Sequence, residues 1–103
     1  MKKTFFLLIL IFFNCRANAE GAYTGKITEI QFYQGHVGIL VALDNMGDPD
    51  KCGRSDHLIL ADTHPHYKEI YALLLAQKLT GSPVRLHLAG CVQGLPSIVH
   101  VVA

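Results

Sequence analysis

Three side chains that often bind metal ions stand close together near the middle of the chain. Asp62, His64 and His66 form a D-x-H-x-H pattern. A zinc site needs three or four ligands, and two histidines at this spacing would point to different sides of a helix. Pro65 between them favours an irregular helix entry instead. Structural or surface histidines are therefore the favoured interpretation, and a metal site built on these three residues is kept as an alternative.

The chain lacks the residue patterns of the common catalytic sites. It contains no G-x-S-x-G nucleophile turn, no phosphate-binding glycine loop and no dinucleotide fingerprint. Acidic residues gather only in the polar loop at 44–56, which lacks the glycine and glutamate positions of an EF-hand. We therefore predict a protein that is not an enzyme and that needs no cofactor.

Aromatic and neutral polar side chains, which suit sugar binding, occur along the first predicted strand. They are Tyr23, Thr24, Gln31, Tyr33 and Gln34. These residues form a candidate glycan-binding surface. An exposed polar strand edge would use the same residue types, and this simpler interpretation stays open.

One helix is predicted between Asp62 and Pro83. Asp62 or Thr63 could accept a hydrogen bond from its first turn, and Gly81 can take the left-handed conformation that ends a helix. Its apolar positions cover more than the single face that packing on a sheet requires. We therefore expect it to contact a second subunit, through Tyr67, Tyr71, Leu75 and Lys78. The alternative is that the protein is a monomer and that the broad apolar face of the helix packs in its own core.

Five strands are expected around this helix. They are Tyr23–Tyr33, Val37–Leu43, His57–Ala61, a segment from Val84 to Gly90, and Ser97–Val102. Ile27 is out of phase with Ile30, which predicts a bulge near Thr28 and Glu29. The order β-β-β-α-β-β predicts a mainly β fold, a five-stranded OB-type Greek-key barrel with one helix. His87 and His100 would then lie on adjacent strands.

The N-terminal residues predict export. Lys2 and Lys3 precede an apolar run from Phe5 to Phe13, and Ala17-Asn18-Ala19 follows as a small-x-small cleavage site. The run is too short to span a bilayer. We predict a signal peptide at 1–19 and a single domain at 20–103, located in the periplasm or secreted.

Charge and cysteine content restrict the partners of the exported chain. Removing Lys2, Lys3 and Arg16 from the nine basic residues leaves six against eight acids, a net charge of −2. Such a chain does not suit a nucleic-acid ligand, because phosphate binding needs Lys and Arg. Cys52 and Cys91 form an even pair in an exported protein, which predicts a disulfide. Closing that loop should stabilise the fold by about 4 kcal/mol.

Two segments resemble a known family. HYKEIYALLLAQKLTGSPVRLHL is similar to the helix and following strand of the subtilase-cytotoxin and pertussis-like toxin B subunits, and AYTGKITEIQF is similar to their first strand. The resemblance implies a small secreted OB-fold protein that forms a pentameric ring, binds sialylated glycans and serves virulence with a toxin A subunit. Thr24 after Tyr23 matches a sugar-contacting hydroxyl of the family, where a serine is expected. The chain is shorter and has one cysteine pair where relatives often have two.

Two functions are therefore expected from the sequence. The first is a secreted, non-catalytic binding subunit that resembles a pentameric toxin B subunit and recognises a sialylated host-cell glycan. The second is a stand-alone periplasmic OB-fold domain that binds a protein or a small ligand without a toxin partner.

Overall fold

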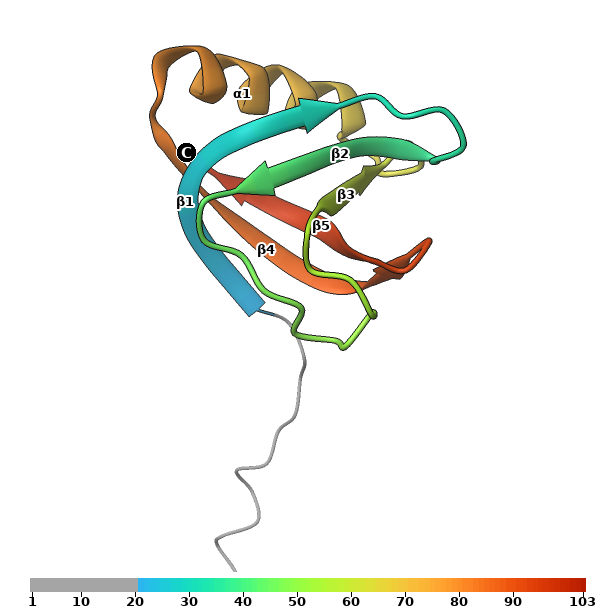
Figure 1. The fold of residues 1–103 in the computed structure, drawn as a ribbon. Coiled ribbons are helices and arrows are strands. Elements are labelled where there is room, and N and C mark those ends of the chain that lie inside the picture. Colours follow the sequence, from blue (N-terminus) through green and yellow to red (C-terminus); the bar gives the residue numbers. More distant parts are fainter. Residues whose placement is uncertain (1–20) are drawn as a thin grey trace, which may run out of the picture.

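Five strands and one helix follow one another in the predicted order β-β-β-α-β-β. The computed structural model describes residues 21–103, and the predicted signal peptide lies outside the described residues. The elements are β1 (Gly21–Gln31), β2 (Gly38–Leu43), β3 (Leu58–Ala61), α1 (Tyr67–Thr80), β4 (Pro83–Val92) and β5 (Leu95–Val102) (Figure 1).

The strands close into a barrel in the order β1-β2-β3-β5-β4. β1 belongs to both halves of it, because Gly21–Lys26 pairs with β4 and Ile27–Gln31 pairs with β2. The register shifts between Ile27 and Glu29, which confirms the predicted bulge, and β1 curves strongly along its length (Figure 1). A parallel contact of Ile59 with Ser97 joins β3 to β5. The predicted OB-type barrel is therefore confirmed.

Apolar side chains from every element fill the barrel. The buried cluster consists of Ile27, Ile39, Val41, Leu43, Leu58, Leu60, Ile70, Leu74, Val84, Leu86, Leu88 and Ile98. α1 lies across one end of the barrel (Figure 1) and contributes Ile70 and Leu74. A second cluster of Leu40, Ile59 and Leu95 covers the other face of β2, so this strand is buried on both sides.

The helix ends as predicted but begins later. Gly81 closes it in the left-handed conformation, with φ of 70°. The expected start at Asp62 or Thr63 is wrong, because residues 62–66 form turns and His66 precedes the first helical residue without a side-chain cap. The His64 ring instead accepts a hydrogen bond from the His66 backbone N–H, at 3.0 Å. No helix within residues 21–103 is long and apolar enough to cross a membrane.

The acidic loop between β2 and β3 is tied to the barrel by covalent and hydrogen bonds. The predicted disulfide joins Cys52 to Cys91 of β4, with 5.5 Å between the Cα atoms. The Asp48 carboxylate accepts hydrogen bonds from the backbone N–H groups of Cys52 and Gly53. Asp44 accepts one from Lys26. The acids therefore hold the loop conformation, and the disulfide indicates an oxidising compartment.

Candidate functional site

The predicted glycan-binding residues lie at opposite ends of β1. Tyr23 packs against the barrel core, and its hydroxyl lies over Gly47, whereas Thr24 is exposed on the outer face. Gln31 ends the strand and donates a hydrogen bond to Glu29. Tyr33 lies beyond the strand, in the turn to β2. The structure therefore divides the predicted surface into two candidate regions, one around Thr24 and one around Tyr33.

Thr24 belongs to an outer sheet face that carries basic side chains from three strands. Thr24 pairs with Arg85 of β4, and directly opposed residues of antiparallel strands project from the same face. The chain neighbours of Arg85, Val84 and Leu86, are buried, so Arg85 points outward. The cationic sheet face, as we call it, comprises Thr24, Lys26, Arg85, His87 and His100.

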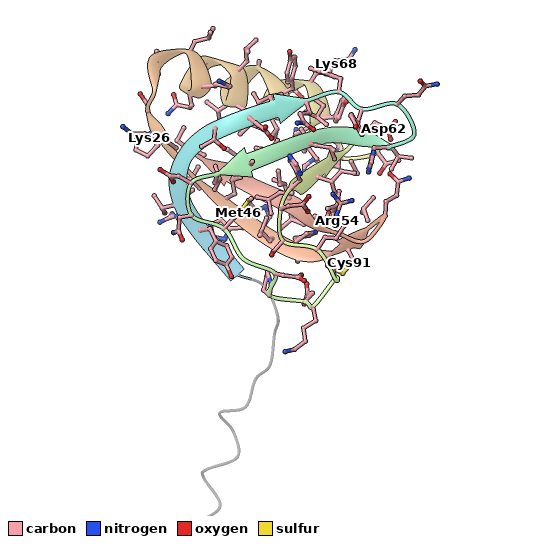
Figure 2. All side chains as sticks on the ribbon, viewed as in Figure 1. Lys26, Met46, Arg54, Asp62, Lys68 and Cys91 are labelled. Carbon is pink, nitrogen blue, oxygen red and sulfur yellow. A yellow bond between two sulfur atoms is a disulfide. The ribbon has the colours of Figure 1, made fainter. Side chains whose placement is uncertain are left out.

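The side chains of this face are open to solvent or stacked on each other. Lys26 projects from the outer side of β1 (Figure 2). His87 and His100 lie on adjacent strands, as predicted, and their rings meet edge to face with centroids 5.6 Å apart. No described carboxylate forms an ion pair with Arg85. Its guanidinium is therefore free to bind an anion.

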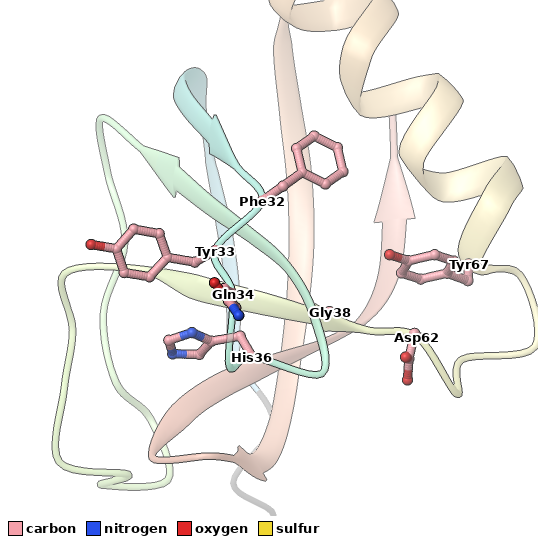
Figure 3. Close-up of a pocket in the computed structure, with 7 residues that line it drawn as sticks. All are labelled: Phe32, Tyr33, Gln34, His36, Gly38, Asp62 and Tyr67. Atoms are coloured by element: carbon pink, nitrogen blue, oxygen red, sulfur yellow. The ribbon is translucent and has the colours of Figure 1, made fainter.

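Tyr33 belongs to a shallow depression at the other end of β1. The depression has a volume of about 290 Å³ and is lined by Phe32, Tyr33, Gln34, His36, Gly38, Asp62 and Tyr67. Tyr33 and His36 lie on one side of it, and Asp62 and Tyr67 on the other (Figure 3). We call these seven residues the aromatic depression. It combines exposed rings with a carboxylate and an amide.

Hydrogen bonds hold the turn that forms this depression. The Gln93 side chain, in the β4–β5 turn, accepts from the Val37 N–H at 2.7 Å and donates to the Gly35 carbonyl at 3.0 Å. The Asp62 N–H donates to the Val37 carbonyl. Gly38 fits because a Cβ atom there would collide with the Leu60 carbonyl. The turn is therefore fixed before any ligand binds.

Burial and nearby charge affect two polar groups that line the depression, the Tyr67 hydroxyl and the His36 ring. Partial burial, the charge of Asp62 and the nearby Tyr71 raise the pKa of the Tyr67 hydroxyl above its usual value. This hydroxyl points toward the depression (Figure 3). The His36 Nδ1 atom is buried without a hydrogen-bond partner among the described residues. Such a group is one that a ligand or a water molecule commonly satisfies.

The D-x-H-x-H residues do not assemble into a metal site. His64 Nε2 lies 3.0 Å from the Val99 carbonyl of β5, and His64 Nδ1 accepts from the His66 N–H. Both ring nitrogens of His64 are thus engaged in holding the helix entry. Within residues 21–103 no group of three or more His, Cys, Asp and Glu side chains could hold a metal ion.

A second set of charged side chains links the acidic loop to β1. Arg54 donates two hydrogen bonds to Asp56, at 3.0 and 2.7 Å, and thereby holds the pKa of that carboxyl well below its usual range. His57 lies between Asp56 and Glu29, with its Nε2 atom 2.8 Å from the Glu29 carboxylate. Arg54 is therefore already paired, unlike Arg85.

The candidate interface residues of α1 share one broad side of the helix but differ in their exposure. Tyr67 and Tyr71 pack partly against the barrel core, and Tyr71 meets Phe32 edge to face at 5.6 Å. Lys78 is exposed. Leu75 and Leu79 are 37% and 77% exposed, and their spacing of four puts them on one outward side. The available apolar surface of α1 is therefore at these two leucines.

Comparison with known protein families, curated proteins and solved structures finds no match for this chain. The family resemblance therefore stays a prediction. Over residues 21–103 the structure establishes a small, mainly β barrel of five strands with one helix and one disulfide.

Sequence reasoning missed several residues of both regions. Arg85 and His87 alternate with buried residues along β4, so their exposure was readable, but their place beside Thr24 depends on the strand register. Asp62 and Tyr67 were assigned to the helix rather than to the depression. Gln93 gave no signal, because its partners lie more than fifty residues away in the sequence.

Proposed function

We propose that this protein is an exported, non-catalytic glycan-binding subunit whose cationic sheet face binds the carboxylate of a sialylated glycan. One observation carries the proposal: the exposed pair of Thr24 and Arg85, side by side in the β1–β4 register. A guanidinium without a described ion-pair partner beside a hydroxyl group suits a carboxylated, hydroxyl-rich ligand.

The chemistry of each group supports this assignment. A guanidinium presents parallel N–H donors that match the two oxygens of a carboxylate, and these charge-assisted bonds are stronger than neutral ones. The Thr24 hydroxyl can donate to one ligand oxygen or accept from another. Lys26 adds positive charge nearby, on an exported chain whose predicted net charge is −2. The cations gathered here therefore favour an anion on this face.

The exposed leucines of α1 support assembly into a ring, as in the toxin B subunits. Leu75 and Leu79 would be covered by a neighbouring copy, which removes apolar surface from water. Five copies would present five glycan sites to one cell surface, and linked sites raise the overall affinity far above that of a single site. Such a ring could also carry a toxin A subunit.

A glycan-binding assay with charge variants tests the proposal. The exported protein should bind immobilised sialylated glycans, and sialidase treatment of those glycans should reduce the signal. Arg85→Gln keeps most of the side-chain length but removes the charge, so the affinity should fall by about tenfold or more, equivalent to 1.4 kcal/mol.

Arg54→Gln is the matched control. It removes a guanidinium that already pairs with Asp56, outside the sheet face. Glycan binding should therefore be unchanged in this variant. Equal binding by wild type, Arg85→Gln and Arg54→Gln would reject the proposal, as would binding that sialidase does not affect.

A further inference from the structure

The aromatic depression is a second candidate site, separate from the cationic sheet face. Thr24 lies near the start of β1 and Phe32 follows its end, with the bulge between them. The two regions share no residue. A ligand in the depression would therefore bind independently of Arg85.

The location agrees with how OB-type barrels bind ligands. These barrels commonly use the β1–β2 and β4–β5 loops to bind oligosaccharides or oligonucleotides. Here the β1–β2 turn supplies Phe32 to His36, and Gln93 of the β4–β5 turn fixes it with two hydrogen bonds. A turn fixed in advance loses little conformational freedom on binding.

Exposed aromatic rings give the depression a surface for a flat, partly apolar ligand. Phe32 and Tyr33 are 64% and 62% exposed. Phe32 rests edge-on against Tyr71, and the Tyr33 ring lies 5.9 Å from that of His36. Exposed rings of this kind can stack on the C–H face of a pyranose. Small-molecule sites combine such apolar surface with a few placed polar groups.

The polar groups select an uncharged ligand rich in hydroxyls. The Asp62 carboxylate and the Gln34 amide, on opposite sides of the depression (Figure 3), can each accept a hydrogen bond from a sugar hydroxyl. No Lys or Arg lines the depression, and the Asp62 charge would repel a carboxylate or a phosphate. The rings lie on opposite sides of an open trough rather than around one point, which does not suit a cation cage (Figure 3).

From these features we infer that the aromatic depression binds a neutral disaccharide, with one sugar ring on Tyr33 beside Gln34 and the hydroxyls of the other unit on Asp62 (Figure 3). The volume of about 290 Å³ is at the small end of ligand pockets, which fits one or two sugar units. The site takes a different part of a glycan, or a different glycan, from the cationic sheet face.

An NMR titration with three neutral sugars tests this inference. The probes are the methyl glycosides of the disaccharides lactose, cellobiose and mannobiose, added to the isotope-labelled exported protein. At least one should shift the backbone amides of Gly35, Gly38 and Asp62 in a saturable way, with millimolar affinity. Tyr33→Ala should weaken this binding by about tenfold, whereas Tyr33→Phe, which keeps the ring, should retain it.

Two further variants separate this site from the proposed function. Asp62→Asn should weaken the neutral sugar, while Arg85→Gln should leave it unchanged. If none of the three sugars shifts the depression, or if Tyr33→Ala binds as well as wild type, the inference is wrong. The same holds if these amides shift with protein concentration alone, because a second copy would then occupy the depression. None of these outcomes affects the test of sialylated glycans at Arg85.

Discussion

Tyr67 joins the lining of the aromatic depression to the barrel core, and its titration should be measurable. Burial, the charge of Asp62 and the nearby Tyr71 raise the pKa of its hydroxyl above the ordinary tyrosine value of about 10. The folded protein therefore holds this proton more tightly than the unfolded chain, so stability present below about pH 10 is lost as the pH rises further. The Tyr67→Phe variant lacks this hydroxyl, so the part of the stability loss at alkaline pH that Tyr67 causes should disappear.

Denaturant unfolding between neutral and alkaline pH measures this effect. Tyr33→Phe is the control, because the Tyr33 ring is exposed and its hydroxyl is remote from the core. It should retain the alkaline loss of the wild type. The same slope of stability against pH in Tyr67→Phe and wild type would contradict this account of Tyr67.

His64 is the histidine whose loss should cost most stability in the helix entry. Its two hydrogen bonds, to Val99 and from His66, join α1 to β5. His64→Ala removes both and should lower the free energy of unfolding by about 1–3 kcal/mol. His66→Ala, at an exposed position, should change it by less than about 0.5 kcal/mol. Equal losses in the two variants, or stoichiometric zinc in the purified protein, would contradict a structural role.

At the scale of the elements, the loop between β2 and β3 is the segment whose attachment to the barrel depends on a covalent bond, the Cys52–Cys91 disulfide. The disulfide joins residues 39 apart in the sequence, and without it the loop is held by hydrogen bonds that water can replace. Cys52→Ser should lower the free energy of unfolding by about 2–5 kcal/mol. Thermal unfolding with and without a reductant checks the same point. Identical melting in the two states would contradict a stabilising disulfide.

Local signals in the sequence predicted the elements, and contacts distant in sequence explain where those predictions fail. The phase slip at Ile27 indicated the bulge, and Gly81 indicated the helix end. The helix start was misplaced because His64 finds its partner Val99 on β5, 35 positions along the chain. No local pattern carries that information.

The residues of the two candidate binding regions were also only partly predictable from local sequence. Tyr23, Thr24 and Tyr33 were grouped because they share one strand. In the structure Tyr23 turns to the core, Thr24 faces outward and Tyr33 leaves the sheet. The neighbours that matter, Arg85 for Thr24 and Asp62 for Tyr33, come from other elements and depend on strand register and turn contacts.

At the scale of the whole molecule, two adjacent leucines of α1, one buried and one exposed, allow the folding of the domain to be tested separately from its assembly into a ring. Leu74 is fully buried in the barrel core, and Leu75 is 37% exposed on the outer side of the helix. In the proposed ring, Leu75→Glu should dissociate the assembly and leave a folded monomer. Leu74→Glu should instead unfold the domain, because it buries an unpaired charge.

Light scattering on a size column, combined with circular dichroism, measures both outcomes. Wild type should have the mass of five subunits, and Leu75→Glu that of one. A monomeric wild type would contradict the ring and favour a stand-alone periplasmic domain. Unfolding of Leu75→Glu would place this residue in the core of the domain.

The proposal that the cationic sheet face binds sialic acid is tested most directly by an NMR titration of the predicted mature chain, residues 20–103, with methyl α-sialoside. The account predicts saturable shifts at Thr24, Arg85 and His87, which weaken as salt concentration rises because the interaction is ionic. The same shifts should be absent in Arg85→Gln. Shifts confined to the aromatic depression, or no saturable shift in the wild type, would contradict it.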